Sequence, residues 1–162
     1  MAFPMETQQE SYWCWNAVAV SIEHFFDASS TLTQDEFAVQ ALGVPLQDAD
    51  EPYYLQDALT DLRLLNKYLQ GYYLTFEQIQ QQIAAGVPVG VHIVWNEGGS
   101  HYVVITGYGQ SPGGKPVVYV SDPLLGDSNV VAWDYDAFVL AYDPSYAQAA
   151  EGAWVDTCLV QA

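Results

Sequence analysis

Residues 7–26 read TQQESYWCWNAVAVSIEHFF, and this stretch places a cysteine where a helix is expected to begin. Between residues 13 and 26 the strongly polar side chains are few: Asn16, Ser21, Glu23 and His24. A helix of this composition is apolar around most of its circumference, so we expect it to run through the core. Cys14 then lies in the first turn of a buried helix. Unpaired N–H groups and the positive end of the helix dipole favour a thiolate there.

Gln8 lies six residues before Cys14. A side-chain amide held just upstream of a nucleophile can donate a hydrogen bond to the oxygen that becomes negative when a thiolate attacks a carbonyl. Gln9 follows directly, so the sequence leaves open which of the two glutamines is the donor. A lone cysteine at a helix start is more often a small buried hydrophobic residue, and the case for a nucleophile depends on the rest of the chain.

Composition restricts the class of protein. Of the 162 residues, 51% are hydrophobic and 14% are aromatic, which is typical of a globular domain and not of a disordered chain. The formal net charge is −17 and the sequence pI is about 4.1. Such a surface repels phosphate backbones and anionic lipids, so we expect no nucleic-acid partner and no membrane partner. Cationic or neutral substrates fit better, although solubility is the simpler explanation of the acidic surface.

Targeting and metal signals are lacking in the sequence. No stretch approaches the ~20 apolar residues of a membrane span, and the first residues lack the basic and apolar regions of a signal peptide. From this sequence we therefore expect a soluble, cytoplasmic protein. Removal of a leader peptide or export by another route stays open. Cys14 and Cys158 are expected to stay thiols. The Cys and His spacings match no common zinc motif, so we expect no metal and no cofactor, and we assume a monomer.

The hydrophobic periodicity predicts helices first and antiparallel strands second. Thr33 with Glu36 forms a capping box for a short helix ending at Gly43, a further helix is expected over 53–65, and Thr75 caps another that ends near Gly86. We expect an extended segment at 68–74, strands at 87–95, 101–108, 117–120, 130–133 and 154–160, and a helical turn at 134–141. The fold class is therefore α+β in a single domain, 1–162. It has an N-terminal helical lobe (1–86) and a C-terminal antiparallel β-sheet lobe (87–162).

This division predicts a cleft between the Cys14 helix and the sheet, with the catalytic base on the sheet side. His101 begins a strand directly after the sequence Gly-Gly-Ser, and Asp122 ends the next strand, so the two are expected to be neighbours on paired strands. A carboxylate beside an imidazole fixes its tautomer and supports its positive form. Asp122 also suits a turn before Pro123, and His92 stays an alternative base.

The blocks GGSHYVVITGY at 98–108 and VYVSDP at 118–123, together with Gln8 and the Trp-Cys-Trp segment, resemble compact bacterial papain-like cysteine peptidases. That group includes the double-glycine leader peptidases of bacteriocin exporters and a plant-pathogen effector protease. The resemblance covers roughly residues 7–125. It implies a papain-like fold, with a Cys-His-Asp triad in place of the Cys-His-Asn of papain. Its site residues here are Cys14 as nucleophile, His101 as base, Asp122 as its partner and Gln8 as oxyanion donor.

The predicted function is hydrolysis of peptide bonds in a peptide or protein substrate through an acyl-thioester. Two alternatives stay open. Deamidation, transpeptidation or peptide cyclisation uses the same intermediate, and an inactive papain-like binding module retains the fold without turnover. Among the aromatic residues near the predicted site, Trp13 and Trp95 are the candidates for substrate contact.

Overall fold

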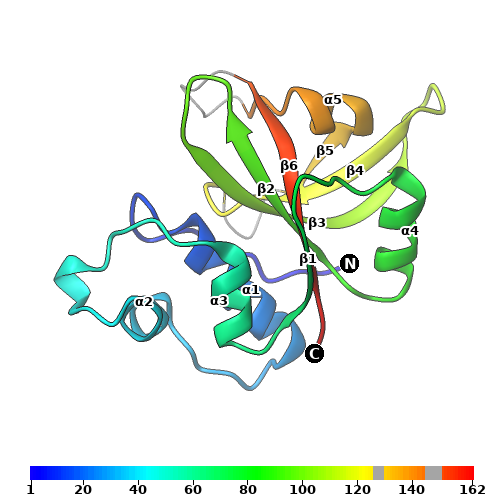
Figure 1. The fold of residues 1–162 in the computed structure, drawn as a ribbon. Coiled ribbons are helices and arrows are strands. Elements are labelled where there is room, and N and C mark those ends of the chain that lie inside the picture. Colours follow the sequence, from blue (N-terminus) through cyan, green and yellow to red (C-terminus); the bar gives the residue numbers. More distant parts are fainter. Residues whose placement is uncertain (126–129, 145–150) are drawn as a thin grey trace.

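The computed structural model describes residues 1–125, 130–144 and 151–162. It has a helical part and a sheet part (Figure 1). The helical part contains α1 (Cys14–Phe26), α2 (Gln34–Leu42), the 3-10 turn η1 (Leu46–Asp48) and α3 (Leu55–Asp61). All strands of the sheet pair antiparallel. This arrangement confirms the α+β prediction, with helices towards the N-terminus and strands towards the C-terminus.

Helix α1 runs through the core as its composition predicts, because residues 15–22 are all buried. The donor groups of its two fully buried polar side chains are paired with backbone carbonyls, whereas Oδ1 of Asn16 has no hydrogen-bond partner among the described residues. The Asn16 amide donates to the Gln34 carbonyl at 2.8 Å, and the Ser21 hydroxyl donates to the Ala17 carbonyl at 2.6 Å. Buried donors that find such partners offset the cost of desolvation, so the helix tolerates these two side chains.

The capping predictions for two helices are confirmed. Thr33 and Glu36 form the reciprocal capping box of α2, which ends at Gly43 with φ +67°. Thr75 and Gln78 form the capping box of α4 (Phe76–Ala84). Helix α3 is shorter than the predicted 53–65, because Arg63 takes the left-handed conformation with φ +62° and ends it.

The sheet has the strand order β1-β6-β2-β3-β4-β5. In chain order its strands are β1 (Leu65–Leu69), β2 (Val89–Trp95), β3 (Ser100–Gln110), β4 (Pro116–Ser121), β5 (Val130–Asp134) and β6 (Gly152–Val160). The C-terminal strand β6 is therefore inserted between β1 and β2. The expected extended segment at 68–74 begins earlier, because residues 65–69 pair with β6 and Gly71, at φ +64°, follows the end of the strand.

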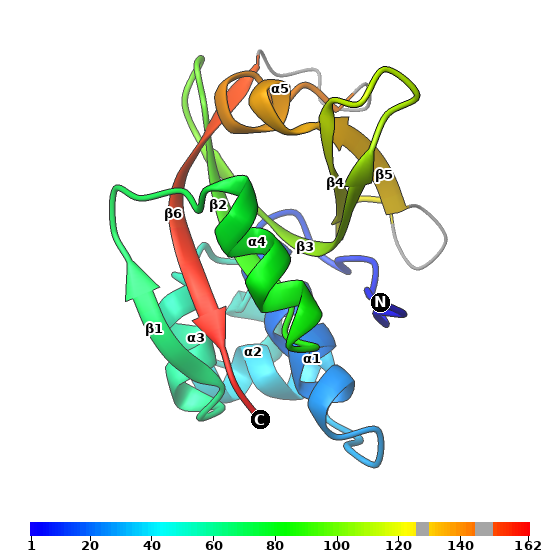
Figure 2. The ribbon, with the colours of Figure 1, turned by 90° about the vertical axis from the view of Figure 1, so that its right-hand side faces the viewer.

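Both faces of the sheet are covered. Tyr102 and Val104 of β3 pack in a core with α1 and α3, whereas the alternate residues Val103 and Ile105 pack in a second core. This second core also contains side chains of α4 and of α5 (Tyr135–Leu140). Figure 2 shows α4 lying in front of β2 and β3, with the helices of the N-terminal part behind and below. Strand β1 therefore belongs to the sheet and helix α4 packs on it, although both precede the predicted division near residue 86.

In the described part of the chain, no helix combines the length and the apolar composition that a membrane span requires.

Candidate active site

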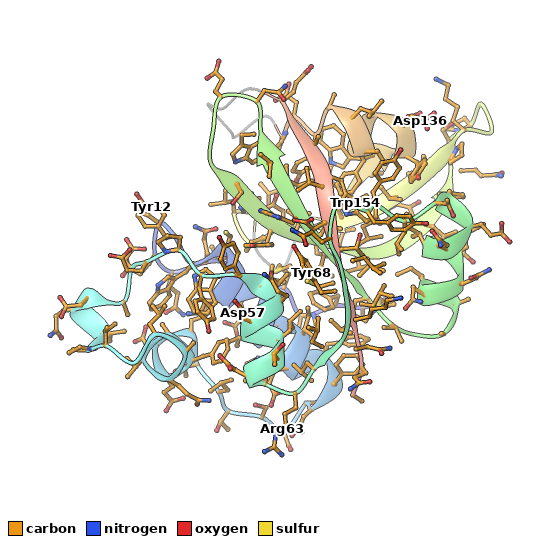
Figure 3. All side chains as sticks on the ribbon, viewed as in Figure 1. Tyr12, Asp57, Arg63, Tyr68, Asp136 and Trp154 are labelled. Atoms are coloured by element: carbon orange, nitrogen blue, oxygen red, sulfur yellow. The ribbon has the colours of Figure 1, made fainter. Side chains whose placement is uncertain are left out.

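A cavity of about 550 Å³ lies between the start of α1 and the start of β3. Most of the described residues that line it have aromatic or small side chains. Three of the four predicted catalytic residues are among them: Gln8, Cys14 and His101. The lining residues are Gln8, Ser11, Tyr12, Cys14, Trp15, Pro52, Tyr53, Trp95, Gly99, Ser100, His101, Tyr102 and Leu124. Tyr12 projects outward from the loop before α1 and is 56% exposed (Figure 3). The cavity therefore opens to solvent beside the predicted nucleophile.

Cys14 is the first residue of α1 and is half-buried. No side chain caps this end of the helix, and the first turn contains no acidic residue. The first-turn N–H groups and the positive end of the helix dipole therefore remain directed towards the thiol and the cavity in front of it.

His101 and Asp122 are paired and buried. The Nε2 atom of His101 lies 2.9 Å from Oδ1 of Asp122, and the two side chains are 5% and 1% exposed. The Leu124 backbone N–H donates to the same carboxylate oxygen at 2.9 Å. An ionised carboxylate only accepts hydrogen bonds, so Nε2 of His101 carries a proton and Nδ1 is left for another partner.

Cys14, which lines the same cavity, is the second side chain that interacts with the imidazole. Burial acts against a charge on His101, but hydrogen bonds with the Asp122 carboxylate and the Cys14 thiol outweigh it and raise the pKa of His101 to about 10. The positive imidazolium is therefore the favoured form at neutral pH. An imidazolium beside a thiol stabilises the thiolate, which is the nucleophilic form of cysteine.

Trp95, one of the two predicted contact residues, lies at the cavity wall. Its ring stacks on the imidazole of His101, with centroids 6.1 Å apart and planes 18° apart. Trp13 is different, because it is 1% exposed and packs with Ala38 and Ala49. Its indole N–H donates to the Ala49 carbonyl at 2.7 Å. Trp13 therefore supports the loop around Ala49 and is not among the residues that line the cavity, which corrects that prediction.

Gln8 lines the cavity, and Gln9 is not among the lining residues. The Gln8 side-chain N–H groups donate to the carbonyls of Glu10 at 2.9 Å and Ser11 at 3.2 Å. Its Oε1 atom is buried and has no hydrogen-bond partner among the described residues. The backbone N–H of Gln9 donates to Oε1 of Gln34 at 3.2 Å. Gln9 therefore helps to anchor the segment, and Gln8 is the glutamine that lines the cavity together with Cys14.

The alternative base, His92, pairs elsewhere. Its Nδ1 lies 2.7 Å from Oδ2 of Asp156, and its ring stacks on Tyr102 at a centroid distance of 4.7 Å. It is not among the cavity-lining residues. Cys158 is 3% exposed, and burial followed by the charges of Asp156 and Asp57 raises the pKa of its thiol to about 12. We therefore expect Cys158 to react slowly, so that it serves as an internal reference for Cys14.

Sequence reasoning missed Tyr142. Its hydroxyl donates to Oδ2 of Asp122 at 2.7 Å, and the residue is 1% exposed. The tyrosine follows α5, twenty residues after Asp122, and belongs to none of the sequence blocks that resemble peptidases. Its aromatic character alone offers no signal, since most of the tyrosines in this chain lie elsewhere.

Comparison with known proteins identifies a family. Residues 1–153 match the Peptidase_C39 like family. The chain belongs to this family. A comparison with curated proteins finds no match.

Among solved structures, the chain is similar to the bromelain protease from Ananas comosus, described in complex with the E64 inhibitor. The TM-score is 0.63 at 13% sequence identity, and the match covers 99% of this chain and 94% of that one. At this identity the likeness shows the fold, which is papain-like, as predicted. Membership of the Peptidase_C39 like family and the papain-like fold together support a cysteine peptidase.

Proposed function

We propose that the protein hydrolyses peptide bonds through Cys14, His101 and Asp122. The observation that carries the proposal is the 2.9 Å contact between His101 and the Asp122 carboxylate, at the wall of the cavity that Cys14 also lines. Cys14 is the nucleophile, His101 is the proton carrier, and Asp122 holds the imidazole in the tautomer that protonates Nε2.

In the first half of the reaction, the Cys14 thiolate attacks the peptide carbonyl carbon. The C–S bond forms, and the carbonyl electron pair moves to the oxygen. The imidazolium of His101 then protonates the amine nitrogen as the C–N bond breaks, leaving an acyl-thioester on Cys14. In the second half, neutral His101 takes a proton from water, the water oxygen attacks the thioester, and the acid product leaves as the thiolate is restored.

The oxyanion is assigned to the backbone N–H of Cys14 and the side-chain amide of Gln8. The amide of Gln8 has two hydrogens and two carbonyl partners, of which the Ser11 carbonyl is the more distant at 3.2 Å. Donation to an oxyanion therefore requires the amide to release Ser11, or to share one hydrogen between both carbonyls. Apart from Cys14 and His101, the described lining residues carry no side chain that is charged at neutral pH, which suits a neutral stretch of peptide.

The test is alkylation of the folded protein with iodoacetamide near pH 6, followed by peptide mapping. An ordinary thiol with a pKa of about 8.5 reacts slowly there, whereas a thiol paired with an imidazolium reacts fast. We expect rapid labelling at Cys14, none at buried Cys158, and loss of the fast reaction in His101→Ala. Slow labelling of Cys14 in the folded protein contradicts the proposal and favours an inactive binding module.

Mass spectrometry of products then separates hydrolysis from acyl transfer. Fragments whose summed mass exceeds that of the substrate by one water indicate a peptidase. A ligated or cyclised product, or conversion of an amide to an acid without chain cleavage, indicates a transferase or deamidase on the same intermediate. In either case Cys14→Ala is expected to abolish turnover.

A further inference from the structure

Asp122 is held from two sides, and only one side belongs to the proposed triad. Its Oδ1 atom meets His101 and the Leu124 N–H, each at 2.9 Å. Its Oδ2 atom accepts a hydrogen bond of 2.7 Å from the Tyr142 hydroxyl. Asp122 and Tyr142 are each 1% exposed, so bulk water does not compete for this bond.

The length and burial of this hydrogen bond indicate which protonation state of Asp122 it favours. Hydrogen bonds of O–H groups to carboxylates are short and roughly twice as strong as neutral ones. A buried carboxylate that loses a donor becomes costly to keep ionised, and its pKa rises. Tyr142 therefore favours the charged form of Asp122, and it fixes the plane of the carboxylate that faces His101.

The ring of Tyr142 also reaches His101, through Trp95. The Tyr142 and Trp95 rings stack with centroids 6.1 Å apart and planes 15° apart, and Trp95 stacks in turn on His101. The tyrosine backbone exchanges two hydrogen bonds with Gly152 of β6, at 2.8 and 2.9 Å. Phe138 of α5 packs edge-on against the same ring at 5.3 Å. One buried residue is thus connected to both members of the His101–Asp122 pair and is anchored to the sheet.

We propose that Tyr142 is a positioning residue of this site, whose hydroxyl orients Asp122 and keeps it ionised so that Asp122 can hold His101. The proposal rests on the proposed function. It extends the hydrogen-bonded pair of His101 and Asp122 by one member, Tyr142.

The test compares Tyr142→Phe with Tyr135→Phe. Both variants remove one hydroxyl and keep the ring. Tyr135 lies on α5 and donates to the Leu74 carbonyl at 2.9 Å, outside the cavity lining, so it is a matched control. The measurement is the rate of Cys14 alkylation by iodoacetamide between pH 4 and 9, with the melting temperature of each variant.

We expect Tyr142→Phe to slow alkylation at pH 6 by about tenfold, which corresponds to the loss of one charge-assisted hydrogen bond. The fall of the alkylation rate towards acid pH should also begin at a higher pH in this variant, because Asp122 is then protonated more easily. Tyr135→Phe should keep the wild-type profile. In an Asp122→Ala background, Tyr142→Phe should have no further effect, since the hydroxyl acts through that carboxylate.

A Tyr142→Phe protein with the wild-type rate and pH profile overturns this inference while the proposed function stands. An effect of Tyr142→Phe that persists in Asp122→Ala also overturns it, because the tyrosine then acts by general packing. If Cys14 of the wild-type protein reacts no faster than an ordinary thiol, both proposals fail together.

Discussion

The backbone N–H of Gln8 donates a hydrogen bond of 2.9 Å to the carbonyl oxygen of Pro123. Gln8 belongs to the segment that leads into α1, and Pro123 directly follows Asp122 at the end of β4. This bond therefore joins the proposed oxyanion donor to the chain that carries the proposed triad carboxylate. The segment before α1 and the segment after β4 are therefore connected, which limits how far they can separate.

Gln8→Ala is expected to lower kcat by about a hundredfold, as the loss of one oxyanion donor does in other acyl-transfer enzymes. Alkylation of Cys14 by iodoacetamide forms no oxyanion at a carbonyl. Its rate should therefore stay within about threefold of wild type. The comparison is made by steady-state kinetics on any cleaved peptide and by alkylation at pH 6.

Gln9→Ala is the matched control, because it keeps the backbone N–H that binds Gln34 and removes a side chain outside the cavity lining. It should retain near wild-type kcat. Equal losses of kcat in the two variants would count against Gln8 as the donor. Loss of Cys14 alkylation in Gln8→Ala would indicate that the glutamine acts by holding the loop.

Gln34→Ala tests how this segment is held. The Gln34 side chain is fully buried and donates to Oε2 of Glu6 at 2.8 Å and to the Thr7 carbonyl at 2.9 Å, while accepting from the Gln9 N–H. Its removal leaves buried polar groups unpaired, so we expect a loss of about 1–3 kcal/mol in the free energy of unfolding, measured by urea denaturation.

We expect kcat of Gln34→Ala to fall as well, because Gln8 lies within the segment that these bonds hold. Gln40→Ala on the exposed side of the same helix is the control and should change neither quantity. A Gln34→Ala protein as stable as Gln40→Ala would contradict the role given to this buried amide.

The sequence predicted the parts of the site whose signals are local. The Cys14 helix follows from a run of apolar residues, and the His101 and Asp122 positions follow from two consecutive strands that pair with each other. Consecutive antiparallel strands are usually neighbours, so their ends meet. That rule needs no knowledge of the remaining sheet.

Contacts between residues far apart in the chain could not be predicted from such local signals. Strand β6 pairs with β1 and β2, and Tyr68 lies opposite Cys158 although they are far apart in sequence. Trp13 and Trp95 look alike as aromatic candidates, and only packing shows that Trp13 is covered by Ala38 and Ala49. Tyr142 reaches Asp122 because the chain returns to the sheet after α5, which no spacing rule predicts.

The pairing of His101 with Asp122 is expected to make the free energy of unfolding depend on pH above pH 6.5. Its pKa is raised from 6.5 to about 10 because hydrogen bonds with Asp122 and Cys14 outweigh burial. A histidine with a higher pKa in the folded state stabilises that state fully below pH 6.5, and the contribution is lost as the pH rises through about 10. The free energy of unfolding should therefore decrease across this window.

Denaturant unfolding of wild type, His101→Gln and Asp122→Asn at intervals across that window measures the effect. The stability advantage of wild type over either variant should shrink as the pH rises, because each variant lacks the pair from the start. An advantage that stays constant, or that grows towards alkaline pH, would contradict the imidazolium–carboxylate assignment.

Gly152 tests whether the aromatic stack beside His101 has to be closely packed. A Cβ atom at this position would lie 2.5 Å from Cγ2 of Ile93 and 2.5 Å from Cε3 of Trp95. Both atoms belong to side chains of β2, and these side chains have to shift to make room for the added methyl group. We expect Gly152→Ala to destabilise the protein by about 1–3 kcal/mol through overpacking.

The displaced ring would also be Trp95, which stacks on both His101 and Tyr142. Gly152→Ala should therefore slow Cys14 alkylation even at temperatures where the protein is fully folded. Gly113→Ala is the control, because the nearest atom to its added methyl group is Oγ of Ser111 at 3.9 Å. A folded Gly152→Ala protein with wild-type alkylation would show that His101 is held by Asp122 alone. The stack would then contribute only to the stability of the fold.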